Sequence, residues 1–206
     1  MSYLLEEVDD IFSIRPVPYR IAMSGGSVVS LLPNILDHIK SEIQIEVYLV
    51  DERYVPHDHP DSNTGALTTV LEKYPNIRFF PLPILSAVEE SRMTYETMLR
   101  WVHFDLIILG AGPDGHTASL FPHTSALDDT APVLHTTTDT FAIHDRLTLS
   151  FDRMREAGAI WIYFSGEKKS HIYDAFLSPT TDYHDYPVLK LREYKQAKVW
   201  YVREDL

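Results

Sequence analysis

Short apolar runs alternate with amphipathic stretches along most of the chain, and this alternation is typical of an α/β domain. Apolar runs that read as strands cover residues 19–23, 45–50, 78–80, 104–109, 147–149, 160–164 and 199–202. Amphipathic stretches that read as helices or helical turns cover residues 4–12, 64–74, 86–101, 151–156 and 168–177. A further helix should run from the first strand toward Lys40, and Pro33 must kink it or set its start.

Composition and net charge indicate a single domain and limit the partners that the protein can have. The chain has 206 residues, of which 45% are hydrophobic, and we expect a single domain over residues 1–206. There is no cysteine, which excludes disulfides and thiolate catalysis and fits a reducing, cytoplasmic location. No leader or bilayer-spanning run is recognisable. The net charge of −12 argues against nucleic-acid or anionic-membrane partners.

Three polar motifs each follow a predicted strand: residues 24–27, residues 51–53 and residues 110–116. In an open parallel sheet the carboxyl ends of the strands lie along one edge, and ligands bind in the crevice there. The motifs are therefore expected to meet at one site, although they lie far apart in the sequence.

The third motif carries the strongest chemical signal. Asp114 and His116 flank Gly115 at the end of a buried strand, where a neutral imidazole would be a natural general base. The three glycines also match a dinucleotide-binding fingerprint. That alternative requires an acid at the end of the next strand, but Asp128 and Asp129 lie in a polar loop.

The first two motifs offer groups that bind anions, and each has a simpler alternative. Gly25, Gly26 and Ser27 precede a helix, so their N–H groups suit a phosphate, or Ser27 is an ordinary N-cap. Asp51 and Arg53 could face the crevice, with Arg53 on a substrate oxyanion, or they form a solvated charged turn.

Later segments supply further candidates. Lys168 and Lys169 follow a buried strand, where a lysine could reach a phosphate, unless they only begin a solvated helix. Arg146 opens its strand, so it reaches the same edge only if that strand is antiparallel or its preceding loop folds over. The histidines and acids of residues 54–63 allow a metal site, but the prolines favour an extended loop ending in an N-cap at Ser62 or Asn63.

Taken together, these blocks resemble the 6-phosphogluconolactonase family, a branch of the glucosamine-6-phosphate isomerase/deaminase superfamily. The blocks that carry the resemblance are Ala22-Met23-Ser24-Gly25-Gly26-Ser27, Asp51-Glu52-Arg53 with Pro60-Asp61-Ser62-Asn63, Gly110 to Pro122, Arg146-Leu147-Thr148-Leu149-Ser150, and Gly166 with Lys169. The resemblance implies a Rossmann-like three-layer αβα sandwich with a mostly parallel sheet. It also implies hydrolysis of 6-phospho-D-glucono-1,5-lactone, without metal or organic cofactor.

The same resemblance implies roles for individual residues. His116 would activate water on the lactone carbonyl, with Asp51 close to the reacting sugar. Beyond the resemblance, we expect Asp114 or another carboxylate to orient the imidazole. The 6-phosphate would lie on the glycine loop and two cations, and Arg53 would contact substrate oxygens. The expected phosphate ligands are Gly25, Gly26, Ser27, Arg146 and Lys169. Donors in the loop at 110–115, or Arg53, would stabilise the oxyanion.

Two other functions remain open at this point. The deaminase branch shares the glycine loop and the Asp-Gly-His motif, but it carries Ala-Phe-Asn-Glu-Pro where this chain has Ala118-Ser119-Leu120-Phe121-Pro122. A catalytically silent sugar-phosphate-binding protein would need the cations but not the base at His116. The chain also has Val28-Val29 where the lactonases usually have Thr-Pro, and its first block begins early, at Ala22.

Overall fold

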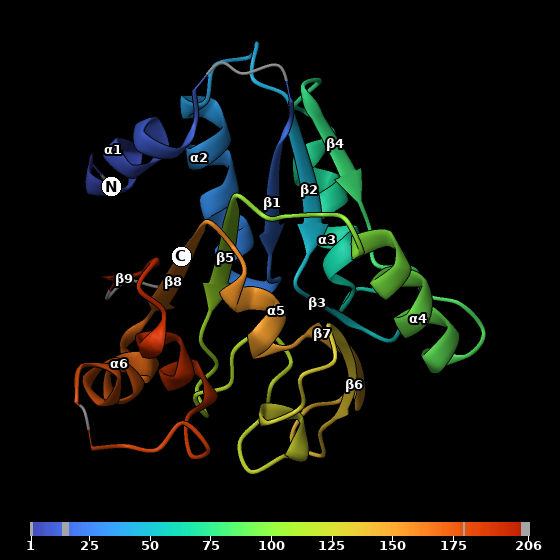
Figure 1. Cartoon of the computed structure of the whole chain (residues 1–206), viewed down its shortest axis with the longest axis vertical. Coiled ribbons are helices and arrows are strands. Elements are labelled where there is room, and N and C mark those ends of the chain that lie inside the picture. The colour runs from blue at the N-terminus through green and yellow to red at the C-terminus, as the bar shows by residue number, and fades with distance from the viewer. Residues whose placement is uncertain (1, 14–16, 179, 203–206) are drawn as a thin grey trace.

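A six-stranded parallel sheet forms the centre of the molecule. The computed structural model describes residues 2–13, 17–178 and 180–202. The strand order is β4-β2-β1-β5-β8-β9, and every neighbouring pair is parallel. The strands are β1 (Tyr19–Met23), β2 (Ile45–Leu49), β4 (Ile77–Phe80), β5 (Leu106–Gly110), β8 (Ala159–Ser165) and β9 (Ala197–Val202). Helices cover both faces, which confirms the predicted α/β layering (Figure 1).

The helices also lie close to their predicted positions. The α-helices are α1 (Ser2–Ile11), α2 (Leu32–His38), α3 (Asn63–Leu71), α4 (Val88–Leu99), α5 (Phe151–Arg155) and α6 (Ser170–Leu177). Short 3₁₀ segments are η1 (Gly26–Leu31), η2 (Ser125–Leu127), η3 (Glu167–Lys169) and η4 (Pro187–Glu193). Pro33 occupies the first turn of α2, where its missing N–H costs no hydrogen bond, so it sets the start of that helix.

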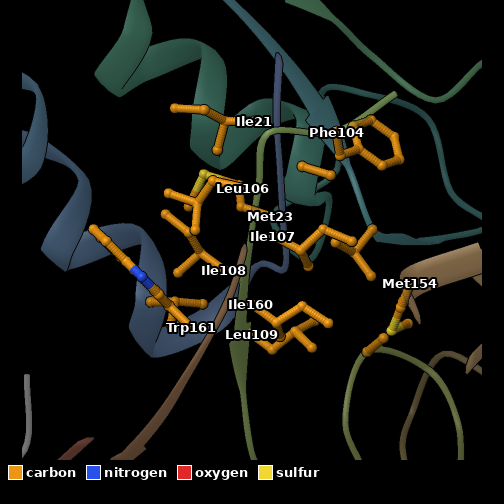
Figure 2. Packing of buried hydrophobic residues seen from close by; sticks show 14 of the residues in the cluster. Ile21, Met23, Phe104, Leu106, Ile107, Ile108, Leu109, Met154, Ile160 and Trp161 are labelled. Carbon is orange, nitrogen blue, oxygen red and sulfur yellow. The ribbon is translucent and has the colours of Figure 1, made fainter. Parts of the chain in front are cut away.

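The central strand β5 is buried on both faces, which explains its continuous apolar run. Successive side chains point to opposite sides of a strand. Accordingly, Leu106 and Ile108 point toward the side of α2, whereas Ile107 and Leu109 point toward Met154 of α5 (Figure 2). The core therefore lies in two layers, one on each face of the sheet.

A second, antiparallel sheet lies across the carboxyl ends of the first one (Figure 1). It consists of β3 (Asp51–Arg53), β6 (Val133–Thr137) and β7 (Asp145–Leu149), in the order β3-β7-β6. The sequence did not predict β6, and the interpretation of residues 51–53 as a charged turn is wrong because they pair with β7. Val50 alone separates β2 from β3. Its N–H donates to the carbonyl of Met23 in one sheet, and its carbonyl accepts from the N–H of Leu149 in the other.

Within the described residues, no helix is both long enough and apolar enough to cross a bilayer.

Candidate active site

A cleft of about 220 Å³, open to solvent, lies between the two sheets at the carboxyl ends of the parallel strands. The predicted site residues that line it are Gly25, Gly26, Ser27, Asp51, Arg53, His116, Arg146 and Lys169. Asp114 is not in the lining but bonds the imidazole of His116. The predicted convergence of distant motifs is therefore confirmed as a matter of geometry.

The first glycine loop brings bare backbone to the cleft. A Cβ on Gly25 would lie 1.8 Å from Oδ1 of Asn63, so no larger residue fits there. Gly26 has a φ of +69°, a conformation that favours glycine, and it begins η1. The N–H groups at the start of a helical segment have no partner within it, which makes this loop suited to an anion.

Ser27 is not the N-cap that the simpler alternative required. The cap position belongs to Gly25, and no side chain caps this segment. Instead, the Ser27 hydroxyl accepts a hydrogen bond from the hydroxyl of Ser165, at 3.1 Å, which ties the loop to the end of β8. The glycine loop, which lines the cleft, is thus held against the end of the neighbouring strand.

Two cationic side chains reach the cleft, one from each sheet's segments. Lys169, at the end of η3, lines it, whereas Lys168 does not. Arg146 reaches it because β7 is antiparallel to β3, which was one of the two geometries that the sequence allowed. Burial, together with the charge of Arg53 across the β3–β7 pair, lowers the pKa of Arg146. Arg53 and Arg146 are directly paired across β3 and β7, and two neighbouring guanidinium groups favour a bound anion.

His116 and Asp114 form a pair on the turn that follows β5. Nδ1 of His116 lies 2.5 Å from Oδ1 of Asp114, and the backbone N–H of His116 donates to the same oxygen at 3.2 Å. Burial alone would raise the pKa of Asp114, but the bonds and charge of His116 outweigh it and hold this pKa below its ordinary value. Nε2 of His116 has no hydrogen-bond partner in the described part of the chain.

Gly112 makes room for this imidazole, since a Cβ there would lie 2.1 Å from Cε1 of His116. The N–H groups of the same loop are largely committed. Gly112 donates to the carbonyl of His116, Gly115 donates to that of Gly112, and Ala111 donates to that of Tyr163. The sequence predicted that the oxyanion donor is either this loop or Arg53. Because these N–H groups already have acceptors, Arg53 is the better candidate.

Asp51 is buried, lines the cleft and has one carboxylate oxygen without a hydrogen-bond partner. Its Oδ2 accepts a hydrogen bond from the hydroxyl of Ser119 at 2.8 Å, whereas its Oδ1 is buried without a partner. Ser119 also accepts, through its carbonyl, a bond from Thr136 of β6. Ser119 therefore fastens the loop that carries His116 to the small sheet that carries Asp51.

The prediction missed two residues that shape the site. Glu52, fully buried, accepts hydrogen bonds from the N–H groups of Arg53, Asn63 and Thr64 at 2.7–2.8 Å. It thereby joins β3 to the start of α3. Phe141, in the loop between β6 and β7, lines the cleft. In the sequence, Glu52 stands between two charged residues and Phe141 stands in a polar loop. Neither pattern distinguishes the residue from one on the surface.

The metal alternative for residues 54–63 finds no support in the geometry. Nε2 of His57 lies 3.0 Å from the carbonyl of Leu82, and Nδ1 of His59 accepts from the N–H of Asp61. Within the described residues, no three His, Cys, Asp or Glu side chains are grouped as a metal site requires. Ser62 caps α3 by accepting from the N–H of Gly65, as the alternative interpretation of this loop predicted.

Comparison with known proteins gives this arrangement a family. A family model described as glucosamine-6-phosphate isomerases/6-phosphogluconolactonase matches residues 1–200. The chain belongs to this family. A 6-phosphogluconolactonase from Synechocystis sp. is 35% identical over 181 residues, which cover 81% of this chain and 75% of the relative.

Solved structures of the family share the fold. A 6-phosphogluconolactonase from Shewanella baltica is 28% identical with a TM-score of 0.79, and the match covers 98% of this chain and 88% of that one. A monomeric glucosamine-6-phosphate deaminase has a TM-score of 0.83 at 17% identity, covering 98% of this chain and 92% of that one. The fold alone therefore does not distinguish the two branches of the family, and the site must do so.

Proposed function

We propose that this enzyme hydrolyses 6-phospho-D-glucono-1,5-lactone to 6-phospho-D-gluconate, a step of the oxidative pentose phosphate pathway. The observation that carries the proposal is the combination in one cleft of His116, whose Nε2 is unpaired among the described residues, with an anion-binding loop, Arg146 and Lys169. The named lactonase relatives support the same substrate class.

The geometry supports a base-assisted hydrolysis. Nε2 of His116 takes a proton from water as the water oxygen bonds to C1 of the lactone. The carbonyl electron pair moves onto oxygen, and Arg53 stabilises that oxyanion. When the carbonyl re-forms, the bond from C1 to the ring oxygen breaks and the imidazolium returns its proton to that oxygen. Asp114 holds Nδ1 and thereby keeps Nε2 as the proton-accepting nitrogen.

The phosphate is bound away from the reacting carbon. The N–H groups of Gly25, Gly26 and Ser27 and the side chains of Arg146 and Lys169 surround the part of the cleft suited to it. Because the protein carries a net charge of −12, this local cluster has to overcome long-range repulsion of an anionic substrate. Asp51, close to His116 in the cleft lining, would contact the sugar.

The deaminase alternative is disfavoured by the residues beside the base. The deaminase motif places a glutamate where this chain has Phe121, which is buried with its ring 5.1 Å from that of His116. No carboxylate therefore occupies that position to assist ring opening. A silent sugar-phosphate binder is disfavoured because binding needs no Asp114–His116 pair. We expect no metal or organic cofactor, no nucleic-acid partner and a cytoplasmic location.

The test compares two products. Purified protein, treated with EDTA, is mixed with 6-phosphogluconolactone while proton release is followed against spontaneous hydrolysis, and separately with glucosamine 6-phosphate while ammonia is measured. Acceleration of proton release alone supports the proposal. Ammonia release, unaccelerated hydrolysis by folded protein, or activity that EDTA abolishes and a divalent ion restores would each overturn it.

A further inference from the structure

The orientation of His116 needs an anchor beyond its partner carboxylate. Both hydrogen bonds that the Asp114 side chain accepts come from His116 itself, one from Nδ1 and one from the backbone N–H. The pair is thus closed on itself, and among the described residues no third side chain bonds Asp114 to hold it in place. The packing of neighbouring side chains therefore has to fix the orientation of the imidazole, which a third hydrogen-bonding group would otherwise fix.

Two aromatic rings pack on the imidazole. Phe121 lies 5.1 Å from it, centroid to centroid, at an interplanar angle of 47°. Phe141 approaches at 5.3 Å and 78°, an edge-to-face contact, and the two phenyl rings lie 5.8 Å apart. The three rings therefore form a triangle. Phe121 follows His116 closely in the chain, whereas Phe141 comes from the β6–β7 loop and is the member that also lines the cleft with His116.

Phe141 also faces a cation of the site. The guanidinium carbon of Arg146 lies 5.7 Å from the centre of the Phe141 ring, within the range of a cation–π contact. The Arg146 side chain is fixed further by its Nε, which donates to the carbonyl of Ile143 in the same loop. One loop thus contacts both the expected base and an expected phosphate ligand.

We propose that Phe141 is a positioning residue, which holds the His116 imidazole so that Nε2 faces the cleft. This inference rests on the proposed function for its kinetic effect, but the contact itself can be observed without activity. An edge-to-face aromatic pair restrains rotation of the imidazole where its own hydrogen bonds do not. Because the ring acts mainly through the base, its loss should lower kcat by a larger factor than it raises KM, and the contact with Arg146 accounts for the smaller change in KM.

The test uses Phe141→Leu, which keeps an apolar side chain, with Phe141→Tyr as the conservative variant. His144→Ala is the matched control, because it removes an exposed ring from the same loop that does not line the cleft. We expect kcat to fall about 3–10-fold in Phe141→Leu, to recover in Phe141→Tyr and to stay at the wild-type level in His144→Ala. Combined with Asp114→Asn, the loss should be less than additive, because both changes act through His116.

A spectroscopic readout separates this inference from the proposed function. The His116 Cε1 proton resonance, assigned by its absence in His116→Asn, should move in Phe141→Leu and stay in place in His144→Ala. If the wild-type protein shows no lactonase activity, the proposed function fails while this readout still reports the contact. An unmoved resonance, wild-type kcat in Phe141→Leu, or a change confined to KM would overturn the positioning role.

Discussion

The two sheets contribute to the cleft in different ways. The parallel sheet supplies the segments at the carboxyl ends of its strands: the glycine loop after β1, the Asp114–His116 turn after β5 and Lys169 after β8. The small antiparallel sheet supplies side chains from within its strands, namely Asp51, Arg53 and Arg146. The inner strands of the first sheet are largely buried and mostly apolar, so this sheet contributes functional groups to the cleft only at the ends of its strands. The second lies across those ends and buries charge.

This contrast explains why the site needs both sheets. Backbone N–H groups and one imidazole can bind an anion and move a proton, but they place no fixed positive charge on the opposite wall. Arg53 and Arg146 do so because β3 and β7 set them directly across from each other. Ser119 then holds the loop of one sheet on the strand of the other, through Asp51. Loss of the base should therefore lower mainly kcat, whereas loss of a phosphate-binding cation from either sheet should raise mainly KM.

The largest effect should come from the base on the parallel sheet. We expect His116→Asn to lower kcat by about 10²–10⁴-fold, because general-base catalysis is lost while folding and binding of 6-phosphogluconate remain. Steady-state kinetics and product titration measure the two parts separately. His57→Ala and His59→Ala are the controls, and a comparable loss in either would place the base in the loop after β3. Loss of product binding in His116→Asn would make it a binding residue.

Arg146→Ala and Lys169→Ala test the cations, one from each sheet. Each removes a charge-assisted contact to phosphate and should weaken binding by about 1.5–3 kcal/mol, raising KM more than it lowers kcat. Titration with 6-phosphogluconate checks the affinity directly. Lys168→Ala is the matched control, since its neighbour alone lines the cleft. If Lys168→Ala is the damaging change, the assignment of Lys169 as the η3 lysine that contacts the phosphate is wrong.

Glu52→Gln tests how the small sheet is fastened to α3. Each carboxylate oxygen of Glu52 accepts from at least one backbone N–H, so an amide nitrogen at either place would face a donor. The free energy of unfolding should fall by about 1–3 kcal/mol. Glu72→Gln, exposed at the other end of α3, is the control for urea denaturation. Equal stability of the two variants would mean that Glu52 does not hold this junction together.

The smallest effect concerns acid stability at the Asp114 turn. Because the pKa of Asp114 is lowered in the folded state, its ionised form stabilises the fold above its unfolded pKa of about 3.9. This contribution is lost as pH falls through the folded pKa. The stability difference between wild type and Asp114→Asn should therefore shrink below about pH 4. A stability difference that persists unchanged into strong acid would contradict this account. The same pH dependence in Asp10→Asn, a control at an exposed position of α1, would contradict it as well.

The sequence predicted the parallel sheet better than the small one, for a physical reason. Strands buried on both faces, such as β5, read as continuous apolar runs. By contrast, β3 is three residues long and wholly charged, and only its pairing with β7 makes it a strand. The motifs at strand ends were therefore placed correctly, whereas Glu52 and Phe141 were missed, because their roles depend on contacts with distant segments.

The most direct test of the shared cleft is a crystal structure with 6-phosphogluconate bound. We expect the phosphate on the N–H groups of Gly26 and Ser27, between Arg146 and Lys169, with the C1 carboxylate beside Nε2 of His116 and near Arg53. Two results would contradict the claim that both sheets bind one substrate. One is a phosphate bound to Arg53 with C1 far from His116, and the other is a ligand that contacts only one of the two sheets.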